Sequence, residues 1–268
     1  MKKLTPIHLE KIWGYEDWLA STHPVACQKE LENFVGGDYP LLVKIIQANS
    51  RLSVQIHPDD ERASMFEHCR GKTEGWYVLS AEKGAQIVYG LNGIYTASEL
   101  RKAIEINSLE DCLRYVEVHA GDFVYVPSGT VHALLGGVQV LEVQQSSDVT
   151  YRFYDWGRGR ECHVEKAIAS IKTDAVRSVN RFQGVFSCPY FTLEEITVEN
   201  EYNSFVDKAS SHILPDDYNL IFVKAGHGIL NGEAVSEKDI FVLSPAEKIT
   251  AKGEMQLMKI IPVQIKHR

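Results

Sequence analysis

The sequence predicts a mainly β protein with two groups of short strands and a few helices. Segments in which apolar residues recur with a period of two outnumber the segments with helical periodicity. Glycine, proline, serine or asparagine bounds most of these segments. Many short strands at close spacing are typical of a barrel or a sandwich, so two groups of strands predict two such bodies.

The strand segments fall on either side of a boundary near residues 175–188. The expected strands of the first group are 41–48, 52–57, 75–81, 85–91, 122–127 and 138–145. Those of the second group are 190–198, 218–225, 228–235 and 239–245. We therefore predict a domain over residues 1–182, with helical insertions, and a C-terminal β domain over 183–268.

Four segments carry helix signals. Residues 98–105 and 108–116 each begin on a serine that can cap a helix, and 59–68 follows a proline and has acids in its first turn. A further helix is expected over 163–172. Helices are thus the minority element.

Composition and charge exclude several classes of protein. A hydrophobic content of 44% and a charged content of 24% are ordinary for a globular chain and disfavour a disordered or fibrous one. The formal net charge of −8 argues against binding nucleic acid through a broad basic face. It does not exclude a small anionic substrate, which a local cluster of lysine and arginine can bind.

The five cysteines are widely spread, and none belongs to a C-x-x-C pair. This usage predicts reduced thiols in a cytoplasmic protein, without disulfides or a cysteine zinc site. The N-terminal residues MKKLTPIHLEKIWG have no apolar run of the signal-peptide kind, and no stretch reaches the roughly 18–20 apolar residues of a membrane span. We therefore expect no membrane partner.

The most specific string is GDFVYVPSGTVHAL, residues 121–134. Its spacing, G-x5-P-x-G-x2-H from Gly121 to His132, is that of the second motif of the cupin superfamily. Gly121 would turn the chain into a strand, Pro127 would end the strand, and Gly129 would permit a tight bend. His132 would then begin the next strand and point inward. This resemblance to the cupin motif makes the predicted fold class more specific: we expect two cupin-like, jelly-roll β-barrels.

The string LSVQIHPDD resembles the first cupin motif. On a strand, Ser53, Gln55 and His57 would share one face. The resemblance places the next ligand, a glutamate, on Glu74 of the following strand. Two imidazoles, a carboxylate and an amide oxygen suit Zn²⁺ with positions left open for water or substrate. Taken singly, either histidine could be a hydrogen-bonded core residue and Glu74 a solvated charge.

A third string, QVLEVQQSSDVTYRFYDWGR, places Glu142, Asp148, Arg152 and Asp155 in one segment. Because an arginine stays protonated, Arg152 suits stabilisation of a developing oxyanion and not proton transfer. The alternative is an ion pair of Arg152 with Asp148 or Asp155.

Together with KIWGYEDWL near the N-terminus, these strings resemble type I mannose-6-phosphate isomerase in its short bacterial form. The resemblance is strong over residues 9–160 and general beyond them. It implies a zinc-dependent aldose–ketose isomerase that interconverts D-mannose 6-phosphate and D-fructose 6-phosphate, with one Zn²⁺ per chain. The implied metal ligands are Gln55, His57, Glu74 and His132, and the implied catalytic arginine is Arg152. Gln55 could instead hydrogen-bond the substrate.

Isomerisation through a cis-enediol needs a base that moves a proton between neighbouring carbons. Lys72 is one candidate, if its pKa is depressed, and Glu142 is another; the sequence leaves the choice open. Ser53, Lys72 and Arg158 are candidates for binding the phosphate. The partner is thus a small phosphorylated hexose, and the oligomeric state is not specified.

Two other functions compete with the isomerase. An iron cupin oxygenase would usually carry three histidines and a glutamate, so Gln55 argues against it. A non-catalytic sugar-phosphate-binding cupin would have lost part of the constellation, such as Arg152. The second strand group has no comparable ligand set, and we expect it to be a metal-free β domain.

Overall fold

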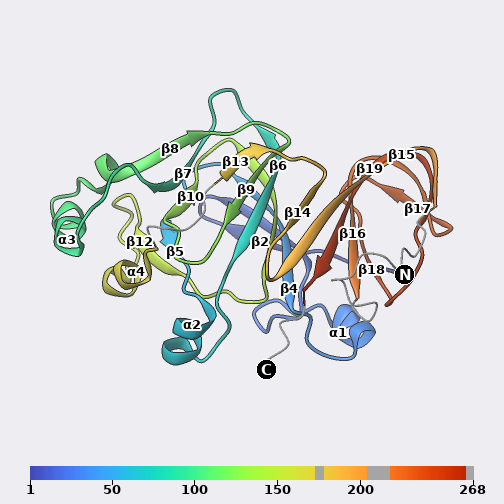
Figure 1. The fold of residues 1–268 in the computed structure, drawn as a ribbon, viewed down its shortest axis with the longest axis horizontal. Helices are drawn as coiled ribbons and strands as arrows, with labels where there is room; N and C mark the ends of the chain where they lie inside the picture. The colour runs from blue at the N-terminus through green and yellow to red at the C-terminus, as the bar shows by residue number, and fades with distance from the viewer. Residues whose placement is uncertain (173–177, 204–217, 264–268) are drawn as a thin grey trace. The chain divides into compact units, whose positions relative to one another are not determined.

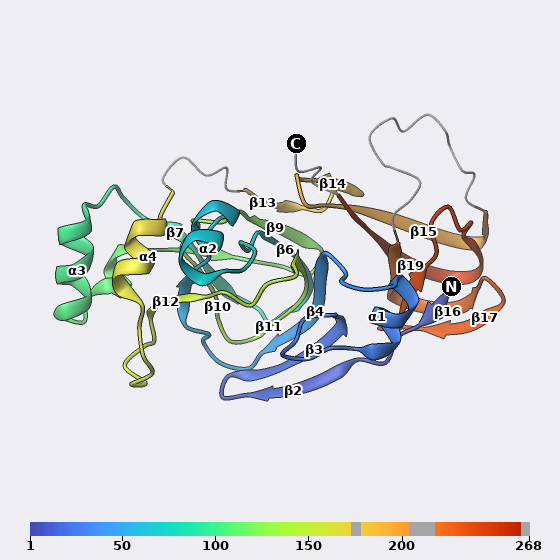
Figure 2. The ribbon, with the colours of Figure 1, turned by 90° about the horizontal axis from the view of Figure 1, so that it is seen from below.

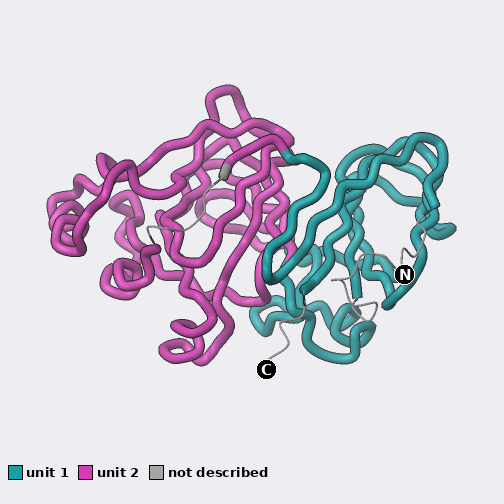
Figure 3. The backbone as a smooth tube through the Cα atoms, in the orientation of Figure 1, with its two compact units in different colours: residues 1–7, 18–42, 182–268 teal, residues 8–17, 43–181 magenta. Residues whose placement is uncertain are grey.

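A computed structural model describes residues 1–172, 178–203 and 218–263. It divides into two compact units, shown in Figure 3: unit 1 comprises residues 1–7, 18–42 and 182–268, and unit 2 comprises 8–17 and 43–181. The expected division at 182/183 stays a prediction. The compact units differ from it because the N-terminal strand β1 (Lys2–Lys3) pairs with β18 (Ile240–Leu243) in the C-terminal sheet.

Unit 2 holds a five-stranded sheet with the order β12-β5-β10-β7-β8 (Figure 1). The bounds of these strands are β5 Val54–Ile56, β7 Gln86–Leu91, β8 Leu113–Glu117, β10 His132–Leu134 and β12 Tyr151–Tyr154. All the strand pairs for which the register is given are antiparallel. The two histidine-bearing segments therefore lie in one sheet, since β5 and β10 are neighbours.

A seven-stranded sheet has the order β13-β9-β6-β11-β4-β3-β2. Its strands are β2 Ile7–Lys11, β3 Gly14–Ala20, β4 Leu41–Ala48, β6 Glu74–Ala81, β9 Asp122–Val126, β11 Val138–Gln145 and β13 Ser178–Arg181. On one face of this sheet, Glu74 stands opposite Gln144 and Trp76 stands opposite Glu142. Polar groups therefore occupy the same face as an indole ring.

The two sheets of unit 2 enclose one hydrophobic core. Trp76, Val78 and Val124 contribute from the seven-stranded sheet, and Ile87 and Tyr89 from the five-stranded sheet. The prediction of a mainly β fold is confirmed. The strands form separate sheets, and the part of the chain that the structure describes contains no closed barrel.

The outer face of the five-stranded sheet packs against helices. Val54 and Ile56 of β5 lie in a second apolar cluster, together with residues of α3 (Ala97–Glu105) and α4 (Val164–Ser170). Figures 1 and 2 both show α4 beside β12, with α3 farther out next to α4. The expected alternation of β5 is confirmed for Val54 and Ile56. Leu52 precedes the strand and belongs to the inner core instead.

Most predicted elements of unit 2 agree with the structure. Helix α2 covers Asp60–Glu67, and the Asp59 side chain caps it by accepting a hydrogen bond from the backbone N–H of Arg62. Helix α3 begins at Ala97, one residue earlier than expected. Thr96, and not the expected Ser98, caps it and forms a reciprocal capping box with Glu99. The sequence did not predict helix α1 (Lys29–Val35), strands β1 to β3, β12 and β13, or the later strands β14 (Val185–Ser187) and β19 (Thr250–Pro262).

The helix predicted over 108–116 is wrong. A short 3₁₀ turn, η1 (Leu109–Cys112), is followed by strand β8, which pairs with β7. The β-branched and aromatic residues at its end, Tyr115 and Val116, fit a strand better than a helix. Here cross-strand pairing overrides the helix signal of the serine and the acids.

Unit 1 contains a seven-stranded antiparallel sheet with the order β1-β18-β16-β19-β15-β14, and β17 pairs with β16. Its remaining strands are β14 Val185–Ser187, β15 Phe191–Asn203, β16 Asn219–Leu230, β17 Glu233–Ser236 and β19 Thr250–Pro262. The predicted strands 218–225 and 228–235 are wrongly divided. The turn lies at Asn231–Gly232, where both residues have positive φ, as a tight Asn-Gly hairpin requires.

No helix among the described residues is long and apolar enough to cross a membrane. All five cysteines lie in described segments and are free thiols.

The loop that delivers His132 has the predicted geometry. Gly121 and Gly129 both have φ of +86°, in the region that favours glycine, and β9 ends just before Pro127. The N–H of Gly129 donates to the carbonyl oxygen of His57 at 2.8 Å. This hydrogen bond joins the segments that carry His57 and His132, so the tight bend at Gly129 helps to position both histidines.

We predict that Gly129→Ala destabilises the protein by more than about 2 kcal/mol, because an L side chain is strained at this φ and its Cβ would lie 2.8 Å from the carbonyl oxygen of Ser170. Gly157→Ala is the matched control, since Gly157 also has positive φ but nothing within 4 Å of the added Cβ; it should lose only about 1 kcal/mol. Urea unfolding of both variants measures the difference, and equal losses would contradict the account.

Candidate metal centre

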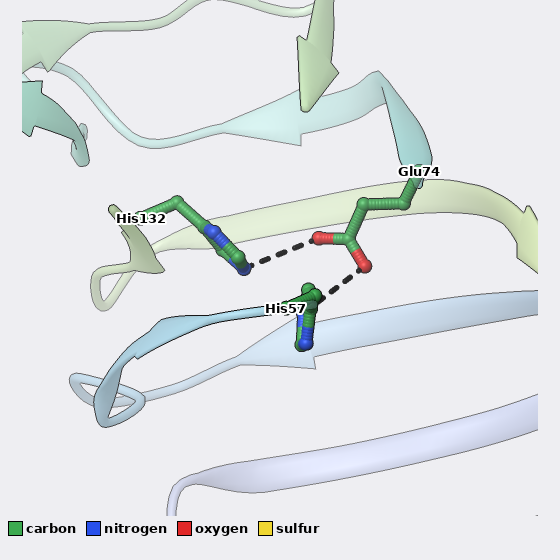
Figure 4. A group of neighbouring side chains, drawn as sticks. All are labelled: His57, Glu74 and His132. Carbon is green, nitrogen blue, oxygen red and sulfur yellow. Dashed lines mark ion pairs between the residues drawn. The ribbon is translucent and has the colours of Figure 1, made fainter. Parts of the chain in front are cut away.

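Three buried side chains from three strand ends converge in unit 2, as Figure 4 shows. His57 directly follows β5, Glu74 begins β6, and His132 begins β10. Glu74 Oε2 lies 3.5 Å from His57 Nε2, and Glu74 Oε1 lies 3.3 Å from His132 Nε2. Each side chain is at most 1% exposed, so the group is closed off from bulk water.

Backbone carbonyls orient both imidazoles. His57 Nδ1 lies 2.8 Å from the carbonyl oxygen of Val149, and His132 Nδ1 lies 2.8 Å from that of Thr130. A carbonyl can only accept, so each Nδ1 carries the proton and each Nε2 presents a lone pair. Both Nε2 atoms and Glu74 Oε1 are buried and have no hydrogen-bond partner among the described residues.

The environment keeps both imidazoles neutral. Burial is the main reason that the pKa of His57 lies well below its ordinary value, and the charge of Lys72 lowers that pKa further. Burial also lowers the pKa of His132 to about 4, although its bond to the Thr130 carbonyl acts in the opposite direction. Neutral imidazole is the form that binds a metal ion.

The donor set fits a divalent cation of zinc type. Two imidazole nitrogens and one carboxylate are a set found in catalytic zinc sites, which leave at least one position open. The ligand atoms of His57, Glu74 and His132 all lie within 4.8 Å of one another. A metal would also satisfy the unpaired Nε2 atoms, whose burial otherwise costs free energy. The group could therefore hold a metal ion.

Gln55 lies on the same face of the sheet as His132. The two residues are directly opposite each other in the pairing of β5 with β10, and Gln55 is opposite Arg152 in the pairing with β12. Cross-strand partners point to the same face, so the Gln55 amide shares the inner face with His132. Its assignment as a fourth ligand stays a prediction.

Charged side chains of alternating sign lie next to one another, beginning at Glu74 and extending away from the histidines. Lys72 Nζ lies 2.9 Å from Glu74 Oε2 and 3.6 Å from Glu142 Oε1, and Lys44 Nζ lies 3.6 Å from the same oxygen of Glu142. Lys44 Nζ is also 3.9 Å from Glu16 Oε2. Lys44, Lys72 and Glu142 are buried, so opposite charges stabilise one another where water cannot.

Burial would lower the pKa of Lys72, but the carboxylates of Glu142 and Glu74 outweigh it and raise that pKa above its ordinary value. Lys72 is therefore an ammonium ion in this arrangement, and its role as a base beside a bound metal ion stays a prediction. Burial, together with the charge of Glu74, raises the pKa of Glu142 against the opposing effect of Lys44 and Lys72. A carboxyl with a raised pKa is suited to exchanging protons.

Lys44 and Glu16 were not singled out in the sequence. The available signal was a lysine inside the apolar strand LLVKIIQA, because lysine is rarely buried without a partner. Glu16 gave no comparable signal, since an acid on a half-buried strand is common. The contacts of Lys44 with Glu142 and Glu16 show that Lys44 and Glu16 belong to the same row of charges as Glu74.

Arg152 lies on β12 and is half-buried. Its Nη1 donates to the carbonyl oxygen of Glu161 at 2.6 Å, and its Nε is buried without a partner among the described residues. The ion pair considered with Asp155 is not formed, because Arg158 and Arg160 bind that carboxylate at 2.7 and 2.5 Å.

The residues proposed to bind the phosphate differ in whether their hydrogen-bond donors already have partners within the chain. Lys72 faces two carboxylates, and Ser53 is buried just before β5. Arg158 donates to Asp155 and, through Nη1, to the carbonyl oxygen of Arg51 at 2.7 Å. Its guanidinium therefore already has partners within the chain, and the phosphate role of all three residues stays a prediction.

We predict that His132→Ala removes bound zinc, because it deletes one of two imidazole donors. Loss of a direct ligand should weaken the zinc affinity more than about 100-fold, since even outer partners of ligands contribute 10- to 100-fold. Elemental analysis after dialysis against zinc measures the content, and circular dichroism checks the fold. His119→Ala is the control, because His119 is exposed; it should keep the wild-type content. Unchanged zinc in His132→Ala would refute the site.

Comparisons with known proteins agree with this geometry. Residues 4–88 match the family model "Phosphomannose isomerase type I, catalytic domain". That range contains Lys44, Gln55, His57, Lys72 and Glu74 but ends before His132 and Arg152.

Two similar curated proteins are mannose-6-phosphate isomerases. ManA of Bacillus subtilis is 47% identical over 148 residues, which cover 53% of this chain and 47% of ManA. The enzyme of Streptococcus mutans is 49% identical over 136 residues, which cover 48% of this chain and 43% of the relative. The aligned part thus spans less than half of the length of each relative.

The fold is similar over nearly the whole chain. The crystal structure of the mannose 6-phosphate isomerase from Bacillus subtilis superposes with a TM-score of 0.81 at 29% identity, covering 97% of this chain and 98% of that one. The motifs, the local matches and the shared fold lead to one conclusion: the chain is similar to the type I phosphomannose isomerases in sequence over its N-terminal part and in fold over nearly its whole length.

Proposed function

We propose that this chain is a zinc-dependent aldose–ketose isomerase that interconverts D-mannose 6-phosphate and D-fructose 6-phosphate. The observation that carries the proposal is the buried His57, Glu74 and His132 group, placed beside a carboxylate that two lysines contact. Two similar curated proteins are named mannose-6-phosphate isomerases, which supports the substrate.

The cofactor of the proposal is one Zn²⁺ per chain, held by His57, Glu74 and His132 with Gln55 as a further ligand. When bound, zinc would supply a Lewis acid that polarises the substrate carbonyl without redox chemistry. Gln55 is included because its amide shares the inner face with His132. We also interpret the sheets as cupin-like jelly rolls, since facing sheets around one core are the layout of that fold.

Glu142 is the base that we favour. Isomerisation takes a proton from one carbon and returns it to the neighbouring carbon, so one group must accept and release the same proton. Glu142 has a raised pKa and lies between two ammonium groups that hold the carboxylate in place. Lys72 keeps its proton beside Glu74 and Glu142, so it suits binding an anionic oxygen of the substrate.

The remaining roles concern charge. Arg152 would stabilise the negative charge that develops on the enediolate, since its guanidinium stays protonated and shares the strand face of Gln55. Ser53, Lys72 and Arg158 are proposed to bind the phosphate. Lys44 is added to the proposal as a partner that positions Glu142.

We place the enzyme in the cytoplasm, on the ground of its free cysteines and a substrate made inside cells. The partner is a small phosphorylated hexose, and the C-terminal β domain is proposed to be metal-free. The described part of that domain contributes no residue to a metal-type cluster.

The assay that tests the proposal measures conversion of mannose 6-phosphate to fructose 6-phosphate before chelation, after chelation and after zinc is restored. Activity should fall more than about 100-fold on complete metal removal and return with zinc. Activity that survives complete removal would contradict the metal isomerase. Iron-dependent oxygen uptake would favour the oxygenase, and metal binding without turnover would favour the non-catalytic cupin.

We predict that Arg152→Ala lowers kcat about 100- to 1,000-fold and keeps zinc, because the substitution removes a charge that acts on the developing oxyanion and deletes no ligand. Steady-state kinetics and elemental analysis on the same sample test both parts. Arg101→Ala is the control: Arg101 pairs with Glu165 on the helical surface, so its loss should leave kcat unchanged. Loss of zinc in Arg152→Ala would show that the residue holds the site together instead.

A further inference from the structure

The end of β11 and the loop that follows it, residues 145–149, form hydrogen bonds with the segments that carry His57 and Glu74. We propose that Gln145 and Ser147 of this loop are positioning residues that set the geometry of His57 and Glu74 for metal binding. The proposal rests on the metal site of the proposed function but not on its substrate. Neither residue belongs to the ligand set or the proton-transfer groups described above.

Gln145 fixes the residue next to Glu74. Its Oε1 accepts a hydrogen bond from the backbone N–H of Thr73 at 2.9 Å, and its own N–H donates to the Thr73 carbonyl at 3.1 Å. Both residues are buried. Gln145 therefore holds Thr73 by one hydrogen bond at its N–H and one at its carbonyl oxygen. These two bonds fix the backbone from which the side chain of Glu74 projects.

The same amide also reaches the segment of the first histidine. Gln145 Nε2 donates to Asp60 Oδ1 at 2.9 Å, and the N–H of Gly71 donates to the same oxygen at 2.9 Å. Asp60 begins α2, three residues after His57. One side chain thus links the segments that carry His57 and Glu74. Gly71 leaves no space for a side chain, since a Cβ there would lie 2.5 Å from the backbone of Asp59.

Ser147 extends this link to the imidazole itself. Its Oγ donates to the carbonyl oxygen of Arg70 at 2.8 Å and accepts from the N–H of Val149 at 3.4 Å. The Val149 carbonyl in turn accepts from His57 Nδ1. Gln144 Nε2 donates to the carbonyls of Gln145 and Ser147, which closes the loop on itself. The loop therefore holds the acceptor that sets the His57 tautomer.

The chemistry of an amide suits Gln145 and excludes its nearest substitutes. The side chain accepts from Thr73 and donates to the Asp60 carboxylate at the same time, which only an amide of this length can do. A glutamate would still accept but would place a second carboxylate against Asp60. Outer partners of metal ligands contribute 10- to 100-fold to metal affinity because they fix the ligand orientation.

The test measures the zinc dissociation constant by competition with a chromophoric chelator, and the visible absorption spectrum of the cobalt-substituted protein. We expect Gln145→Ala to weaken zinc affinity about 10- to 100-fold and to change the cobalt bands, which report ligand geometry. Ser147→Ala should weaken the affinity in the same direction. It provides a second variant if Gln145→Ala does not fold.

Gln139→Ala is the matched control. Gln139 is also a buried glutamine on β11, and its Nε2 donates to Gln47 Oε1 at 2.8 Å, away from the ligand segments. It should lose thermal stability but keep zinc affinity within about twofold and the wild-type cobalt spectrum. If Gln139→Ala weakens zinc as much as Gln145→Ala does, the effect is general destabilisation and the proposal fails.

The sharpest variant is Gln145→Glu, which keeps the side-chain length and the acceptor for the Thr73 N–H but replaces the donor to Asp60 by an oxygen. It should weaken zinc affinity about 10-fold or more. No loss of affinity in this variant would overturn the proposal. A protein that passes this test without isomerising mannose 6-phosphate would refute the proposed function and leave this inference standing.

Discussion

The site depends on keeping two buried histidines neutral, with their Nε2 lone pairs turned toward one carboxylate. Burial favours the neutral imidazole, and the carbonyls of Val149 and Thr130 choose the tautomer by accepting from Nδ1. Both carbonyls belong to loops and not to sheet ladders, so they are free to accept. The loops must therefore be rigid, and the left-handed Gly129 and the hydrogen bonds of residues 145–149 make them so.

A second constraint follows, because the negative charge of a carboxylate buried beside neutral imidazoles needs a positive charge nearby. Lys72 supplies it to Glu74, and Lys44 and Lys72 together supply it to Glu142. The result is a row of alternating charges on the inner side of the seven-stranded sheet, from Glu16 to Glu74. The same row contains the cation that we propose to bind an anionic substrate and a carboxyl whose pKa is raised by burial. Charge balance and proposed chemistry thus use the same residues.

Much of this could be predicted from the sequence, since local spacing determines it. The G-x5-P-x-G-x2-H spacing anticipated the positive φ of Gly129 and the inward position of His132, and the alternation in LSVQIHPDD placed Gln55 and His57 on one face. Long-range pairing was beyond reach: the partner of Lys44 lies about a hundred residues away, and β8 is a strand because β7 is beside it. The bonds of Gln145 and Ser147 were missed for the same reason, because their partners, Thr73, Asp60 and Arg70, lie about 70 to 85 residues away and leave no local pattern in the sequence.

The central claim is that two imidazoles and a carboxylate of unit 2 hold the metal ion. Zinc K-edge X-ray absorption on the zinc-loaded protein tests it most directly. We expect nitrogen and oxygen donors at about 2.0–2.1 Å, with the multiple scattering of two imidazole rings and no sulfur. A sulfur shell at about 2.3 Å, or a purely oxygen shell without imidazole scattering, would contradict the account.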